Sequence, residues 1–243
     1  MLEEIRKFYE QTKFDLEKEE FREDFKTPLN WVKIFFKTYP RFSKIKFSKK
    51  AGGLFKSLLN RESTREFSAQ PANLADIEKI LYFSAGIKEQ KEELEKTRRF
   101  YPSAGARYPI EMYLIANNIN SLPRGLYHYS VKNNELEELL NQDLGQESSS
   151  IFGKEMNKYN PNFLVLAGVM SRTEVKYGVN AYRFALLECG HIGQNMYLLS
   201  EKLGLGCCAI GGFDNDKLVR LLDLGEDEIP LYALAFGSKK QNP

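Results

Sequence analysis

Two arginines stand four residues apart on either side of a serine in the segment Arg61-Glu62-Ser63-Thr64-Arg65-Glu66-Phe67. Guanidinium groups bind phosphate and other anionic oxygens, and a serine hydroxyl adds a further donor. Because four residues are about one helical turn, both arginines could reach one side of a helix start, whose free N–H groups also attract anions. The spacing predicts an anion clamp made by Arg61, Ser63 and Arg65, although a solvated charged loop would have the same composition.

Two further segments could bring backbone close to a ligand. Between prolines, Ser103-Ala104-Gly105 would let a flat ligand approach without obstruction by side chains, but a plain turn would use the same residues. Ile210-Gly211-Gly212 ends an apolar run and precedes Asp214, so its N–H groups could also face a ligand. The glycines do not have the G-x-G-x-x-G spacing of a dinucleotide-binding fold.

An adjacent lysine and tyrosine, Lys176 and Tyr177, lie between an apolar run and the longest helical pattern of the chain. Both could transfer protons if burial or a neighbouring cation lowers their pKa values. A solvated lysine beside a packing tyrosine would explain the pair equally well.

Composition favours one main globular domain. The chain has 243 residues, 42% hydrophobic content and a formal net charge of +2, which gives no special affinity for nucleic acid or membranes. No apolar run approaches the roughly 20 residues of a membrane span, and the charged N-terminus lacks a signal-peptide pattern, so we expect a cytoplasmic protein. Two histidines and three cysteines at poor spacing predict no metal site. Cys207 and Cys208 are expected to be small buried residues.

Periodicity predicts the elements that position these segments. The mixture of helices and strands without a regular βαβ repeat favours an α+β fold. Residues 1–50 interleave charges with aromatics and predict an N-terminal extension packed on a main domain at 51–243, while the charged stretch 88–99 predicts an exposed loop or lid. Helices are expected at 74–85 after an Asn73 cap, 148–156, 180–203 and 214–222 with Asp214 as cap; strands are expected at 110–116, 125–130, 135–140, 163–169, 206–211 and 229–236.

Taken together, the segments resemble the flavin-dependent nitroreductase superfamily. Within it they are similar to the SagB-type dehydrogenases, relatives of the azoline-oxidising enzymes of thiazole/oxazole-modified peptide biosynthesis. The motifs that carry the resemblance are Arg61-x-Ser63-x-Arg65-x-Phe67, Pro102-Ser103-Ala104-Gly105-Ala106-x-Tyr108-Pro109, Lys176-Tyr177-Gly178, Glu188-x-Gly190-His191-x-x-Gln194-Asn195 and Ala209-Ile210-Gly211-Gly212-Phe213.

This resemblance implies a three-layer α/β/α arrangement with a central, mainly antiparallel sheet, and a homodimer that binds FMN at the subunit interface. Arg61 would hold the FMN phosphate with Lys239 as a second cation, Ser63 would contact the phosphate or ribityl chain, and Arg65 would lie at the N1–C2 edge of the flavin. Ser103, Ala104, Gly105, Ile210, Gly211 and Gly212 would line the ring. Lys176 and Tyr177 match the catalytic pair of the azoline oxidases, in which a base removes a ring proton while hydride leaves to flavin N5.

Three functions remain open at this point. The first is a SagB-like dehydrogenase acting on an azoline-type ring in a small molecule or a modified peptide. The second is an NAD(P)H-dependent reductase of nitro compounds or quinones. The third is a catalytically idle flavin-binding scaffold among biosynthetic partner proteins. Arg107 is hypothesised to select an anionic or peptide substrate. On the long helix, His191 is expected to be a satisfied core residue, and Glu188 and Gln194 are expected to serve packing and dimer hydrogen bonds.

Overall fold

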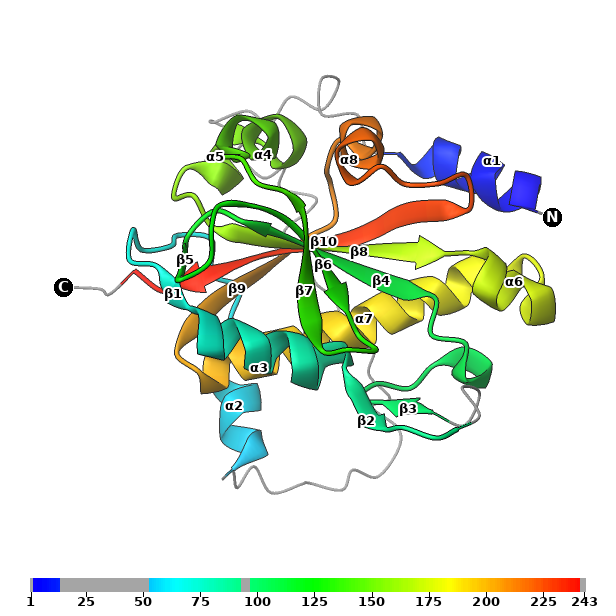
Figure 1. Ribbon diagram of the computed structural model, residues 1–243, viewed down its shortest axis with the longest axis horizontal. Helices are drawn as coiled ribbons and strands as arrows, with labels where there is room; N and C mark the ends of the chain where they lie inside the picture. Colours follow the sequence, from blue (N-terminus) through cyan, green and yellow to red (C-terminus); the bar gives the residue numbers. More distant parts are fainter. Residues whose placement is uncertain (1, 14–52, 93–96, 241–243) are drawn as a thin grey trace, which may run out of the picture.

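A six-stranded antiparallel sheet lies at the centre of the computed structural model, which describes residues 2–13, 53–92 and 97–240 (Figure 1). All neighbouring strands of this sheet are antiparallel. In spatial order the strands are β7 (Glu135–Leu140), β6 (Gly125–Ser130), β4 (Ile110–Ala116), β8 (Asn162–Val169), β10 (Glu228–Ser238) and β9 (Leu205–Ile210). Two small pairs lie outside it, formed by β1 (Ala72–Asn73) with β5 (Ile119–Asn120) and by β2 (Ile87–Glu89) with β3 (Arg98–Arg99).

Successive side chains of the central strands enter two different cores. Along β8, Leu164 and Leu166 belong to one buried cluster, whereas Phe163 and Val165 belong to the other. The alternation follows from the period of two in a strand. Because both faces of the sheet are apolar, both must be covered by other elements.

Helices cover the two faces, as Figure 1 shows. On one face lie α3 (Leu74–Ala85) and the long α7 (Asn180–Lys202); on the other lie α4 (Gly145–Phe152), α5 (Lys154–Asn157) and α8 (Asn215–Leu222). Helix α6 (Ser171–Tyr177) leads from β8 into α7, α2 (Leu54–Asn60) contacts α7, and α1 (Leu2–Thr12) is the first described element. This is the three-layer α+β arrangement predicted from the sequence. Within the described ranges, none of the helices has the length and apolar character that a membrane span needs.

A local sequence signal accounts for the start of α8. Asp214 caps this helix as predicted, since its Oδ1 accepts the Lys217 N–H at 3.0 Å. Other details differ from the predictions, which did not include the helices α2 and α6. Asn73 precedes α3 without a side-chain capping bond, and the helix expected at 148–156 is divided into α4 and α5 by Gly153, whose φ is 87°. The charged stretch 88–99, in its described part, contributes to the β2–β3 hairpin.

The N-terminal extension predicted at 1–50 is described only through α1; the aromatic residues of 14–50 lie outside the described residues. Several side chains of helix α1 contact the main body, including Arg6, which donates to the Glu226 carbonyl. The Tyr9 hydroxyl accepts a hydrogen bond from the Asn215 amide at 2.9 Å, and the Phe8 ring meets Tyr182 of α7 edge to face at 5.5 Å. The domain boundary near residue 50 stays a prediction.

We expect Gly125→Ala to lower the free energy of unfolding by about 1–3 kcal/mol, because a new methyl group must displace backbone. A Cβ at Gly125 would lie 2.2 Å from the Leu140 carbonyl oxygen of the edge strand β7. Gly225→Ala is the matched control, since its nearest neighbour would lie at 3.4 Å. Urea unfolding of both variants checks the prediction, and equal stabilities would contradict it.

Candidate functional site

The predicted clamp segment 61–66 forms neither a helix nor a strand, so the prediction that its arginines lie at a helix start is wrong. Helix α2 ends just before Arg61, and the Thr64 N–H then donates to the Cys207 carbonyl of β9 at 2.9 Å. Two of the three predicted residues, Arg61 and Ser63, meet at Tyr197, whereas Arg65 lies near Cys208.

A tyrosine without a sequence-predicted role joins this segment to α7. The guanidinium of Arg61 lies over the Tyr197 ring, 5.4 Å from its centroid. The Tyr197 hydroxyl lies 3.0 Å from Ser63 Oγ and accepts the Ala209 N–H of β9 at 2.7 Å. The sequence pattern does not single out Tyr197. Tyr197 thus connects the clamp to the strand that leads to Ile210.

Lys239, predicted as a second phosphate cation, lies near the same turn of α7. Its Nζ is 2.8 Å from Glu201 Oε2 and 4.0 Å from Glu62 Oε1. The isolated bridge between Phe67 and Lys239 holds the end of the clamp segment beside the end of β10. The carboxylates of Glu201 and Glu62 therefore offset part of the positive charge that Lys239 would present to an anion. Arg61 and Ser63 contact the uncharged Tyr197 instead, so their donors are less offset.

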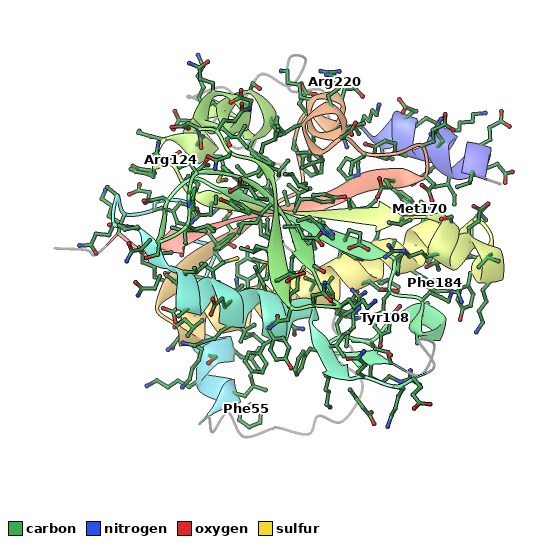
Figure 2. All side chains as sticks on the ribbon, viewed as in Figure 1. Phe55, Tyr108, Arg124, Met170, Phe184 and Arg220 are labelled. Carbon is green, nitrogen blue, oxygen red and sulfur yellow. The ribbon has the colours of Figure 1, made fainter. Side chains whose placement is uncertain are left out.

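The predicted small-residue segment lies beside the predicted lysine–tyrosine pair. Gly105, in the short 3₁₀ turn Ala104–Ala106, has a φ of +60°, a conformation that favours glycine. A Cβ there would lie 2.8 Å from the Tyr177 hydroxyl and 3.1 Å from Lys176 Nζ. The Tyr177 ring is held edge to face by Phe184 of α7, with ring centroids 4.9 Å apart. Phe184 is labelled in Figure 2. Two segments that are far apart in the sequence therefore meet at Gly105.

A buried carboxyl group supports this turn from beneath. Glu188 of α7 is only 2% exposed, and its Oε1 accepts the Ser103 hydroxyl at 2.8 Å and the Ala104 N–H at 3.2 Å. Its Oε2 is buried and receives no hydrogen bond from the described residues. Burial raises the pKa of Glu188 to about 7, against the opposing effect of both hydrogen bonds and the Arg99 charge. The expectation of packing and dimer hydrogen bonds for Glu188 thus missed its contact with the small-residue segment of the same chain.

The remaining predicted residues border open space near β9. No described atom would lie within 4 Å of a Cβ at Gly211, so the backbone after Ile210 is accessible. Gly212 follows in the loop that leads to the Asp214 cap. The exposed Arg65 lies close enough to Cys208 that its charge lowers the thiol pKa, although burial dominates and raises that pKa. Cys207 and Cys208 are both 2% exposed, as predicted.

Charged residues tie α6, which carries Lys176 and Tyr177, to the sheet. Arg172 of α6 pairs with Glu111 of β4, and His128 of β6 lies 3.0 Å from the same carboxylate. The hydrogen bond with Glu111 raises the pKa of His128, helped by Glu137 and opposed by burial. Burial disfavours the ionised form of Glu111, but His128 and Arg172 outweigh it and lower its pKa. The network anchors the helix that carries the predicted catalytic pair.

Arg107 also contacts α6, because its Nε donates to the Arg172 carbonyl at 2.6 Å. This contact links the small-residue segment to α6. It gives Arg107 a positioning contact, while the hypothesised selection of an anionic substrate stays a prediction.

A cavity of about 190 Å³ lies elsewhere, between α1, α8 and the start of β10. None of the predicted site residues lines it. Its charges satisfy one another, since Lys13 lies 2.9 Å from Glu10 and 2.6 Å from Asp216. The cavity is therefore part of the join between α1 and the main body.

The chain belongs to the nitroreductase family: the family model described as "Nitroreductase family" matches residues 58–238. Proteins of this family are flavin-dependent, so the chain is a flavin-dependent oxidoreductase. The matched region includes every predicted site residue except Lys239. The family predicted from the motifs is thereby confirmed.

Two curated relatives differ in what their names describe. A protein of Methanocaldococcus jannaschii described as a nitroreductase, MJ1384, is 30% identical over 75% of this chain and 89% of its own length. The Microcin B17-processing protein McbC of Escherichia coli is 27% identical over 75% of this chain and 73% of its own length. Among solved structures, the E. coli microcin synthetase McbBCD complex with truncated pro-MccB17 matches with a TM-score of 0.74 at 24% identity, covering 99% of this chain and 93% of that chain.

We expect the stability of the wild-type protein to fall as pH rises from about 5 to 8, and Glu188→Gln to lose this part of the dependence. The pKa of Glu188 is raised from its ordinary 4.5 to about 7 in the folded chain. Between these values the folded state keeps a proton that the unfolded state has lost, so stability decreases with rising pH, by roughly 2–3 kcal/mol in total. Glutamine does not titrate.

Denaturant unfolding at pH 5 and 8 measures this difference, with Glu135→Gln on the exposed strand β7 as the control carboxylate. The control should keep the wild-type dependence. Parallel curves for wild type and Glu188→Gln would show that the buried carboxyl is already ionised at pH 5.

Proposed function

We propose that the chain is an FMN-dependent dehydrogenase of the SagB-like type, which transfers hydride between an azoline-type ring in a small molecule or peptide and flavin N5. The observation that carries the proposal is the meeting of Lys176 and Tyr177 at Gly105, because it joins the predicted proton-transfer pair to the predicted ring-binding turn. Similarity to McbC, a processing protein of the peptide microcin B17, supports a modified-peptide substrate.

The residues present fit FMN in kind and in order along α7. Arg61 and Ser63, with Lys239, lie around the turn Tyr197–Glu201 and would hold the phosphate. Toward the other end of the helix, the turn at Ser103-Ala104-Gly105 presents backbone at which the ring would lie, with the open backbone at Gly211 as a second surface. Bound FMN would supply a hydride acceptor at N5.

The protein's own part in the reaction is positioning and proton transfer. Lys176 Nζ lies 5.4 Å from the centroid of the Tyr177 ring, so amine and phenol belong to one small group that can hold or take a proton. Phe184 limits the movement of Tyr177, and Glu188 fixes the turn against which both side chains lie. A base here would remove the ring proton while Arg65, at the electron-accepting edge, would stabilise developing negative charge.

We expect Lys176→Ala and Tyr177→Phe to lower dehydrogenation about a hundredfold or more, the usual contribution of a positioned acid or base, while FMN affinity changes less than threefold. Loss of two hydrogens from an azoline-containing peptide, followed by mass spectrometry, measures turnover. Lys154→Ala on α5, on the opposite face of the sheet, is the control.

Two other outcomes would replace this function. Turnover of NADPH with a nitroaromatic, but none of an azoline peptide, would establish a reductase, the function that similarity to MJ1384 favours. Full function of both variants in a multi-protein complex would establish a flavin-binding scaffold. A colourless protein that takes up no added flavin would contradict all three.

We also propose a homodimer with FMN at the interface. One face of α7 is exposed although the helix is central, and it includes Leu186 at 42% and Leu187 at 55% exposure. Short α2 adds four exposed apolar side chains, and Figure 2 shows the Phe55 ring pointing away from the body. The middle of α7 has an exposed stripe at helical spacing, made by Arg183, Leu186, Leu187, Gly190, His191 and Gln194. Its two exposed leucines, with the exposed apolar side chains of α2, are typical of a surface that another subunit covers.

His191, expected in the core, lies on this exposed stripe. The sequence pattern could not separate burial by the chain itself from burial by a second subunit. The chain shares its fold with a chain of the McbBCD complex. This likeness in fold supports the proposal that the protein works with biosynthetic partner proteins.

We expect Leu187→Glu to weaken self-association at least tenfold, because it would bury a charge in the proposed interface. Leu139→Glu is the matched control, since Leu139 is 45% exposed on the distant edge strand β7 and its replacement should leave association unchanged. Sedimentation equilibrium measures both. A wild-type monomer, or equal effects of the two substitutions, would contradict the dimer.

A further inference from the structure

Tyr197 contacts three parts of the candidate site at once, and it has no role in the function proposed above. Its ring carries the Arg61 guanidinium, and its hydroxyl contacts both Ser63 and the Ala209 N–H. Helix α7 and strand β9 fix it from two sides, so it is a rigid support for the more exposed clamp segment.

Chemistry fixes the direction of one of these two hydrogen bonds. A backbone N–H can only donate, so the Tyr197 oxygen accepts from Ala209 at 2.7 Å. The Ser63–Tyr197 pair, at 3.0 Å, is exposed, and either oxygen can be its donor.

With Tyr197 as the donor, the serine proton is free to donate to a ligand. The contact with the phenol also holds the Ser63 oxygen in place, which suits an anionic ligand because less side-chain freedom is lost when the anion binds. The same ring holds the guanidinium of Arg61 by its π-face, a contact that leaves the N–H groups at the edge of the guanidinium free. Both donors are thus prepared by one side chain.

We propose that Tyr197 is a positioning residue for the phosphate of FMN, acting through the Ser63 hydroxyl and the Arg61 guanidinium, and that it makes the site prefer FMN to riboflavin. The inference rests on the proposed FMN-dependent function. It deepens that function by naming the residue that selects the phosphorylated cofactor.

The test is a titration of flavin-free protein with FMN and, separately, with riboflavin, following the quenching of flavin fluorescence. Tyr197→Phe keeps the ring beneath Arg61 and removes only the hydroxyl. It should weaken FMN binding about five- to tenfold, the effect of one directed hydrogen bond, and change riboflavin binding less than twofold. Tyr182→Phe, also partly buried on α7, is the control and should change neither affinity.

A double-mutant cycle separates action through Ser63 from a general structural effect. If Tyr197 acts through this serine, Ser63→Ala in the Tyr197→Phe background should weaken FMN binding less than Ser63→Ala does in the wild type. Additive effects would overturn the inference, as would equal loss of FMN and riboflavin affinity or unchanged FMN affinity in Tyr197→Phe.

The wild-type titration distinguishes this inference from the proposed function itself. Wild-type protein that binds riboflavin as tightly as FMN would overturn the role of Tyr197 while leaving a flavin site intact. Wild-type protein that binds neither flavin would overturn both.

Discussion

The contact between α7 and the sheet determines where the parts of the site can lie. Ala185, Ile192 and Met196 are fully buried on the inner side of this helix, and a Cβ at Gly193 would lie 2.9 Å from the Tyr232 ring of β10. The close approach leaves the helix little freedom to slide or rotate on the strands. Glu188, Tyr197 and Glu201 project from this fixed helix, so they hold the ring-binding turn, the arginine–serine clamp and Lys239 in a constant order.

The two ends of the site rest on different physical effects. At the clamp, exposed cations and a serine meet solvent, and their positions depend on aromatic and backbone contacts of Tyr197. At the turn, Glu188 lies in an apolar setting where its carboxyl is costly to ionise. Two hydrogen bonds from Ser103 and Ala104 compensate only in part, and they hold the Gly105 conformation against which Lys176 and Tyr177 lie. Ordering of this turn and the charge of one carboxyl are therefore linked.

Much of the fold could be predicted because its signals are local. An apolar run predicted β4, and a pair of runs around a turn signal predicted β6 and β7, all with their observed bounds; the Asp214 cap marked the start of α8. The conformation of Arg61–Arg65 could not be predicted, because spacing alone does not distinguish one helical turn from two strand repeats. It is the pairing of Thr64 with β9, far away in the sequence, that decides between them. Tyr197 and Glu188 were missed for a related reason, since their roles depend on partners brought together only by folding.

Helix α7 also gives the site a fixed length. Glu188 and Tyr197 are nine residues apart, which at 1.5 Å per residue separates them by roughly 14 Å along the helix axis. An α-helix held on a sheet neither stretches nor shortens appreciably, so within one chain the turn and the clamp lie at a fixed separation. A ligand that engages both must match that span. A molecule that has only the ring, or only the anionic group, contacts either the turn or the clamp and leaves the other without a ligand.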